Sequence, residues 1–122
     1  MPLTVINSQG TVEQEFIFDT GCEVTTVSED VAAVLGLPQG GRVVNLHGAT
    51  GTGRSRLVDV RFRFPKTVSG GPGLEVTSTW TVTSGRTNLA LLGFMEVHRH
   101  FHLWTLEFDA YFIPWPILRG VP

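Results

Sequence analysis

Cysteine is almost absent from this chain of 122 residues, in which Cys22 is the single example. One thiol cannot form an internal disulfide, and no paired spacing of cysteine or histidine matches a zinc finger. An excess of positive charge is also missing, since the net charge is -2 at pH 7. Nucleic acids and anionic membranes are normally bound by basic surfaces. We therefore expect neither of them as a partner.

Long apolar runs are lacking as well. No stretch approaches the roughly 20 apolar residues that a membrane span requires, which excludes a transmembrane helix. The first residues do not form a basic region followed by an apolar run, so we predict no secretory signal. We expect a cytoplasmic protein that has no membrane partner.

The composition allows one hydrophobic core. Of the 122 residues, 42% are hydrophobic, which is enough for one core but too little for two ordinary domains. We predict a single domain over residues 1–122, with the tail 113–122 peripheral to it. No segment of the sequence repeats, so any two-fold symmetry would require a second chain.

The pattern of residues is typical of an all-β domain with one or two short helices. Valine, threonine and phenylalanine are frequent, and glycine and proline interrupt the chain often. A helix is predicted after Ser28, which can cap it, and before Gly36, which can end it. A second short helix is expected over 94–100, and a loosely ordered loop over 67–73. We predict strands at 5–6, 12–18, 43–47, 55–64, 74–83, 88–92 and 103–112.

The strongest local signal is an acidic residue at the end of an apolar strand. Asp19, Thr20 and Gly21 follow three large apolar residues at 16–18. An aspartate is disfavoured beside a buried strand unless its charge is solvated, paired or hydrogen-bonded. We therefore expect a specific structure to hold the Asp19 carboxylate, although this motif alone also arises by chance.

Three landmarks in this order make the chain resemble the retropepsin-like aspartic peptidases, which are pepsin-type enzymes with one domain per chain. They are Asp19 to Gly21, the glycine-rich segment 48–53, and the apolar pair Leu91 and Leu92 with Gly93. The resemblance extends from about residue 16 to residue 109. It implies a closed, barrel-like acid protease fold with a flap hairpin, and an aspartic endopeptidase that needs no cofactor and no metal.

The chemistry of this family requires two carboxylates. They share a proton, so that one activates water as a base while the other donates to the scissile carbonyl. Asp30, Asp59 and Asp109 are not followed by a hydroxyl residue and glycine. The resemblance therefore implies a two-fold homodimer in which Asp19 of each subunit meets at the axis. In such a dimer Thr20 would brace the paired loops, and Gly21 would permit their tight backbone.

The other landmarks have implied roles as well. Gly48, Ala49, Thr50 and Gly51 would form a flap that closes over an extended peptide or protein segment and excludes water. The residues that would support the catalytic loop are Leu91, Leu92 and Gly93. A simple structural hairpin is the alternative for the flap. The apolar cleft of the family implies substrates with bulky hydrophobic side chains beside the cut.

The sequence departs from the family pattern in three places. Position 22 is usually alanine or serine, whereas Cys22 stands here, either as inert packing or as a site sensitive to oxidation. Phe94 follows Gly93 where viral members have arginine. Prolines at 114 and 116 are unsuited to a central strand. The tail can therefore pack on the domain, contact a partner or continue further.

Other functions are less consistent with the residues. His98, His100 and His102 would share a face in a strand and could suggest a metal site, but a helix leaves only the first and last as neighbours. The Gly-Thr-Gly at 51–53 lacks the third glycine of a dinucleotide fingerprint. The remaining alternative is a catalytically inactive peptide-binding or dimerisation module with this fold. A run of four arginines is expected to be a solvated strand face, and it could also favour acidic peptides: Arg54, Arg56, Arg61 and Arg63.

Overall fold

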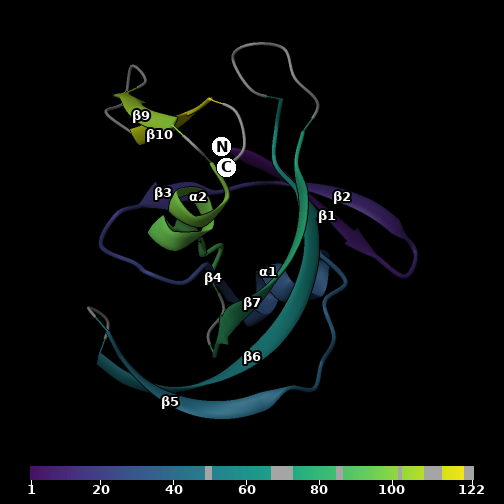
Figure 1. Cartoon of the computed structure of the whole chain (residues 1–122). Coiled ribbons are helices and arrows are strands. Elements are labelled where there is room, and N and C mark those ends of the chain that lie inside the picture. The colour runs from purple at the N-terminus through teal and green to yellow at the C-terminus, as the bar shows by residue number, and fades with distance from the viewer. Residues whose placement is uncertain (49–50, 67–72, 85–86, 102, 109–113, 120–122) are drawn as a thin grey trace.

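The computed structural model describes residues 1–48, 51–66, 73–84, 87–101, 103–108 and 114–119 (Figure 1). The helices of this part of the chain are α1 (Glu29–Val34) and α2 (Phe94–His100). Its strands are β1 (Pro2–Asn7), β2 (Gly10–Glu15), β3 (Ile17–Asp19), β4 (Thr26–Ser28), β5 (Arg42–Gly48), β6 (Gly51–Arg63), β7 (Glu75–Thr83), β8 (Ala90–Gly93), β9 (Leu103–Phe108) and β10 (Pro114–Arg119). The predicted all-β class with one or two short helices is confirmed, and the described residues contain two.

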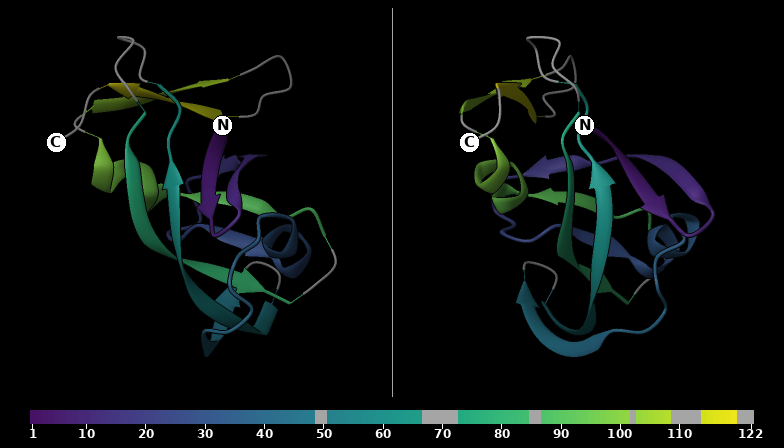
Figure 2. Two further views of the ribbon diagram at one scale, coloured as in Figure 1. Left: turned by 90° about the vertical axis from the view of Figure 1, so that its right-hand side faces the viewer. Right: turned by 45° about the vertical axis from the view of Figure 1, so that its right-hand side comes forward.

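Eight strands form one strongly curled sheet. Seven of them follow the order β2-β1-β6-β7-β4-β8-β3, and β5 pairs with β6 outside this path. The long β6 and β7 bend through the molecule, so that the sheet curls into a half-barrel (Figures 1 and 2). The two ends of the path, β2 and β3, do not pair with each other. The closed barrel that we expected is therefore a half-barrel, because the short β3 adds to the sheet only through β8.

The core lies inside the curl of the sheet. Along β6, Val58, Val60 and Phe62 are buried, whereas the residues between them are exposed, as the two-residue period of a strand requires. Trp80 on β7 is fully buried. Its ring contacts those of Phe16 and Phe62, with centroids 5.4 and 5.1 Å away. Burial of these aromatic rings contributes much of the core's stability.

Both helices form where the sequence predicts them. Ser28 caps α1, because its Oγ accepts a hydrogen bond from the Val31 N–H (3.2 Å). Gly36 follows the helix with φ +69°, a conformation that favours glycine. The predicted strand 12–18 is interrupted at Phe16, because β1 begins at Pro2, opposite Glu15, and the chain then crosses to β8.

The C-terminal strands form a separate sheet. β10 pairs with β9 in an antiparallel, two-stranded sheet, where prolines are tolerated because each strand is an edge. Residues 109–112 of the predicted last strand and 67–72 of the predicted loop lie outside the described residues. In the part of the chain that is described, no helix has the length and apolar character needed to cross a membrane.

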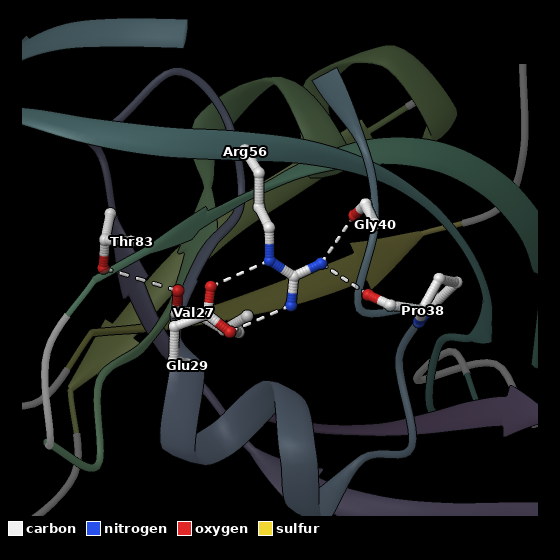
Figure 3. A network of polar contacts seen from close by, with 6 residues as sticks. All are labelled: Val27, Glu29, Pro38, Gly40, Arg56 and Thr83. Atoms are coloured by element: carbon white, nitrogen blue, oxygen red, sulfur yellow. Dashed lines mark hydrogen bonds and ion pairs between the residues drawn. The ribbon is translucent and has the colours of Figure 1, made fainter. Parts of the chain in front are cut away.

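Arg56 corrects the expectation of a uniformly solvated arginine face. Its side chain is only 12% exposed, and it connects β6 to α1 and to the segment after α1 (Figure 3). Nε and Nη2 donate to the two carboxylate oxygens of Glu29 at 2.8 and 2.9 Å. Nη1 donates to the carbonyls of Pro38 and Gly40. Arg56 lies near these partners because the segment after α1 leads into β5, which pairs with β6.

We expect Arg56→Gln to lower the free energy of unfolding by about 2 kcal/mol, because it removes charge-assisted bonds to one carboxylate and two carbonyls. Denaturation in urea measures this change in the free energy of unfolding. Arg61→Gln is the control, since Arg61 is 58% exposed and should change stability by less than about 0.5 kcal/mol. Equal effects of the two variants would contradict the role of Arg56.

The ion pair between Arg56 and Glu29 makes the stability of the folded protein depend on pH. The hydrogen bond from Arg56 lowers the pKa of Glu29 below its ordinary value of 4.5. A lowered pKa contributes stability that is fully present above that value and is lost as the pH falls through the folded-state pKa. The stability of Arg56→Gln should therefore depend less on pH in this acidic range than that of the wild type.

Candidate active site

The end of β3 and the end of β8 lie side by side. These strands are parallel, with Phe18 opposite Leu92 and Asp19 opposite Gly93. Phe18 and Leu92 are almost completely buried and anchor the two strands in the core. β4 pairs with the other side of β8. The loop 20–25 therefore passes the end of β8, and the first and third sequence landmarks meet although they are far apart along the chain.

The Asp19 carboxylate is held by its own loop. Its Oδ1 accepts a hydrogen bond from the Gly21 N–H at 2.9 Å. The Cys22 N–H donates to the Asp19 carbonyl at 3.1 Å, which closes a tight turn. Asp19 is half-buried, whereas Thr20 and Gly21 are exposed. A backbone hydrogen bond thus provides the support that we expected for the Asp19 carboxylate. The loop itself is exposed at the surface of the chain.

Gly93 packs directly against the backbone of this loop. A Cβ atom at position 93 would lie 2.5 Å from the Val24 carbonyl carbon, 2.6 Å from the Thr25 nitrogen and 2.7 Å from the Glu23 carbonyl oxygen. No side chain fits at such distances. The Gly93 N–H donates to Thr25 Oγ1 at 3.1 Å. The predicted support role of Gly93 therefore has a physical basis in the close approach of two backbones.

Helix α2 supports the loop through its first two amides. The N–H groups of Phe94 and Met95 donate to the carbonyls of Cys22 and Glu23, at 2.8 and 3.2 Å. The first N–H groups of a helix have no partner within it, so the loop satisfies them. Two backbone hydrogen bonds therefore join the loop to the first turn of α2.

Thr25 is a site residue that the sequence analysis did not identify. It is fully buried, its hydroxyl accepts from Gly93, and its carbonyl accepts from the Thr81 N–H at 2.9 Å. It therefore connects the loop to both β8 and β7. A buried threonine carries no distinctive local pattern, so the packing of the strands was needed to reveal it.

The predicted flap segment belongs to a hairpin. β5 and β6 pair in antiparallel register up to Gly48 opposite Gly51. The strands therefore reach further into the glycine-rich segment than expected, while Ala49 and Thr50 lie outside the described residues. In both figures the hairpin end of β5 and β6 lies on the same side of the molecule as the chain leaving β3 (Figures 1 and 2).

A comparison with protein families agrees with this geometry. Residues 1–95 match the family model described as aspartyl protease. The chain belongs to the aspartyl protease family. The matched part contains the Asp19 loop, the β5–β6 hairpin and the 91–93 segment, and it ends in the first turn of α2. A search of curated proteins found no significant match.

Cys22 in this aspartyl protease family member is half-buried. Its Sγ donates to the Val24 carbonyl at 2.9 Å and lies 3.7 Å from Thr26 Oγ1. The thiol thus makes contacts within the loop that a serine hydroxyl could also make. These contacts favour packing, one of the two interpretations of Cys22.

The histidines near the C-terminus follow the helical interpretation. His98 is exposed and stacks on Phe94, with ring centroids 5.1 Å apart, whereas His100 is partly buried. His102 lies outside the described residues. Among those that are described, no group of three or more histidine, cysteine, aspartate or glutamate side chains is arranged to hold a metal ion.

Proposed function

We propose that this protein is an aspartic endopeptidase that acts as a homodimer, with a catalytic dyad formed by Asp19 of each subunit. The observation that carries the proposal is the Asp19 loop, in which a backbone N–H holds the carboxylate at the end of a buried strand. The Asp-Thr-Gly sequence occurs once in the chain. A two-fold axis through the exposed loop would supply the second carboxylate.

The paired carboxylates would perform general acid–base catalysis. Two carboxyl groups at close range cannot both ionise cheaply, so they hold one proton between them and titrate as a unit. The ionised partner removes a proton from water as it attacks the peptide carbonyl, and the protonated partner donates to the carbonyl oxygen. The Gly21 N–H would keep each Asp19 side chain oriented for this exchange.

Exposed apolar side chains near the loop support the pairing of two chains. Ile17, two residues before Asp19, is 51% exposed, and Val24, within the loop, is 42% exposed. Burial of such side chains against a second chain would remove apolar surface from water. In the proposed dimer they are covered by the partner, while Thr20, which is exposed in the single chain, braces the loop of the other subunit.

The substrate would bind as an extended segment between the dyad and the β5–β6 hairpin, which acts as the flap. An extended peptide can donate and accept backbone hydrogen bonds along such a hairpin, and closure of the flap excludes water from the reaction. Two surface hollows of the single chain are lined by other residues and do not include Asp19. In this proposal, the substrate cleft is completed by the second subunit.

Activity should depend steeply on protein concentration. A mixed peptide library is incubated with the protein at about pH 3 to pH 7, a range that spans carboxylate titration, over a wide series of dilutions. Below the dissociation constant of the dimer, activity per chain is expected to fall in proportion to concentration. Sedimentation measures the dimer fraction in the same samples. A monomer with full activity per chain would refute the dyad across two subunits.

A further inference from the structure

A buried polar cluster lies under helix α2, away from the Asp19 loop. Glu96 is only 5% exposed, and its Oε1 accepts a hydrogen bond from Ser78 Oγ on β7 at 2.6 Å. The remaining oxygen, Oε2, and Nε2 of His100 are both buried and have no hydrogen-bond partner among the described residues. These two atoms are 3.9 Å apart, too far for a hydrogen bond.

The surroundings of His100 disfavour a positive charge. Its side chain is 21% exposed, and its ring lies beside that of Phe64, which directly follows β6, with centroids 6.2 Å apart. Burial lowers the pKa of His100 below its ordinary value of 6.5, and Arg99 lowers it further, whereas the Glu96 carboxylate opposes both effects. The loss of hydration therefore outweighs the attraction of Glu96 across the gap.

Other charged side chains on the neighbouring strands are directed elsewhere. On β6 and β7, Arg61 and Arg63 are exposed and both pair with Glu75. Asp59 is exposed as well and accepts a hydrogen bond from Thr79 Oγ1 at 2.8 Å. Among the described contacts, the ring of Phe64 lies beside His100, and the Ser78 hydroxyl on β7 holds Glu96.

The helix that carries this cluster also holds the loop of Asp19. Glu96 directly follows Phe94 and Met95, whose amides donate to the carbonyls of Cys22 and Glu23. The bond between Glu96 and Ser78 attaches this first turn to β7. A change in how α2 packs on the sheet can therefore reach the loop through these two hydrogen bonds.

We propose that Glu96 and His100 are positioning residues that form a proton-sensitive support of the Asp19 loop, and that adding a proton to His100 loosens this support. The neutral imidazole fits the buried site beside Phe64. A lowered pKa contributes stability that is fully present above the ordinary value of 6.5 and is lost as the pH falls through the folded-state pKa. Mild acid should therefore weaken the packing of α2 on the sheet and its hydrogen bonds to the Asp19 loop.

The structural part of this inference is tested without any measurement of peptidase activity. Amide hydrogen exchange, followed by NMR, gives protection factors for Phe94 and Met95 from about pH 7.5 down to about pH 5, where histidines titrate. In the wild type these factors are expected to fall several-fold on acidification. In His100→Gln they should stay constant, because the side chain no longer titrates.

His98→Gln is the matched control, since His98 is an exposed histidine on the same helix. This variant should keep the pH response of the wild type. A response that is lost in His98→Gln, or that persists in His100→Gln, would overturn the proposal. Failure of a variant to fold does not remove the test, because the His100 pKa can be measured by NMR in the wild type, and a value at or above 6.5 would contradict the support role.

Glu96→Gln tests the second member of the pair. A glutamine can still accept the Ser78 hydrogen bond but has no negative charge, so the pKa of His100 is expected to fall further. An unchanged or raised His100 pKa in this variant would show that Glu96 does not act on His100. The functional part rests on the proposed peptidase: His100→Gln should keep its activity to lower pH than the wild type. Absence of hydrolysis at every pH would refute the peptidase and leave the exchange result intact.

Discussion

Asp19→Asn is expected to reduce peptide hydrolysis by about a hundred- to ten-thousandfold, which is the typical contribution of a general acid or base. An asparagine cannot take the proton that the dyad exchanges with water and substrate. Its side-chain oxygen can still accept the hydrogen bond from Gly21, which holds the aspartate at 2.9 Å. The loop and the dimer should therefore survive the change, so the loss reports on chemistry.

The measurement compares both proteins on the same peptide library and confirms equal dimer content by sedimentation. Asp59→Asn is the matched control, because Asp59 is exposed on β6 and bonds only to Thr79 among the described contacts. It should leave hydrolysis unchanged. If Asp19→Asn cleaves peptides as well as the wild type, or if neither protein cleaves while both are folded dimers, the binding-module function replaces the peptidase.

Mixing the two proteins shows whether the dyad spans two chains. When an equal amount of Asp19→Asn exchanges freely with the wild type, the activity is expected to fall to about half, because half of the active chains then sit in mixed dimers. A dyad contained in one chain would be insensitive to this addition. The result separates the homodimeric mechanism from any mechanism that uses Asp19 alone.

Gly93→Ala is expected to destabilise the protein by about 3 kcal/mol, at the upper end of what overpacking a core usually costs. The new methyl group would meet three backbone atoms of the Asp19 loop at 2.5 to 2.7 Å. Backbone cannot move aside as a flexible side chain can. The loop and β8 would have to separate, which breaks the bonds between the loop and the first turn of α2.

Urea denaturation gives the stability change, and Gly40→Ala provides the matched control. A Cβ atom at position 40 meets no atom within 4 Å, so this substitution should change stability by less than about 0.5 kcal/mol. If Gly93→Ala proved as stable as Gly40→Ala, the close contact between β8 and the loop would be contradicted. A folded Gly93→Ala protein should also lose amide protection at Phe94 and Met95.

Local patterns in the sequence determined a large part of this structure. The alternation of apolar residues along β6 follows from the two-residue period of a strand, and the Ser28 cap of α1 follows from the chemistry of helix ends. Asp19 was identified as a site residue because an acidic side chain directly follows an apolar strand. Each of these features depends on residues that are neighbours in the chain, and the family match over residues 1–95 agrees with them.

Tertiary structure alone decided how these parts meet. The parallel pairing of β3 with β8, the role of Thr25 and the turn of Arg56 toward Glu29 all join residues that are far apart in the sequence. The same holds for Ser78 and Glu96, whose contact depends on how α2 lies over β7. Side-chain type predicts that a buried polar group needs a partner, but only the packing of the chain brings a particular partner within hydrogen-bonding distance.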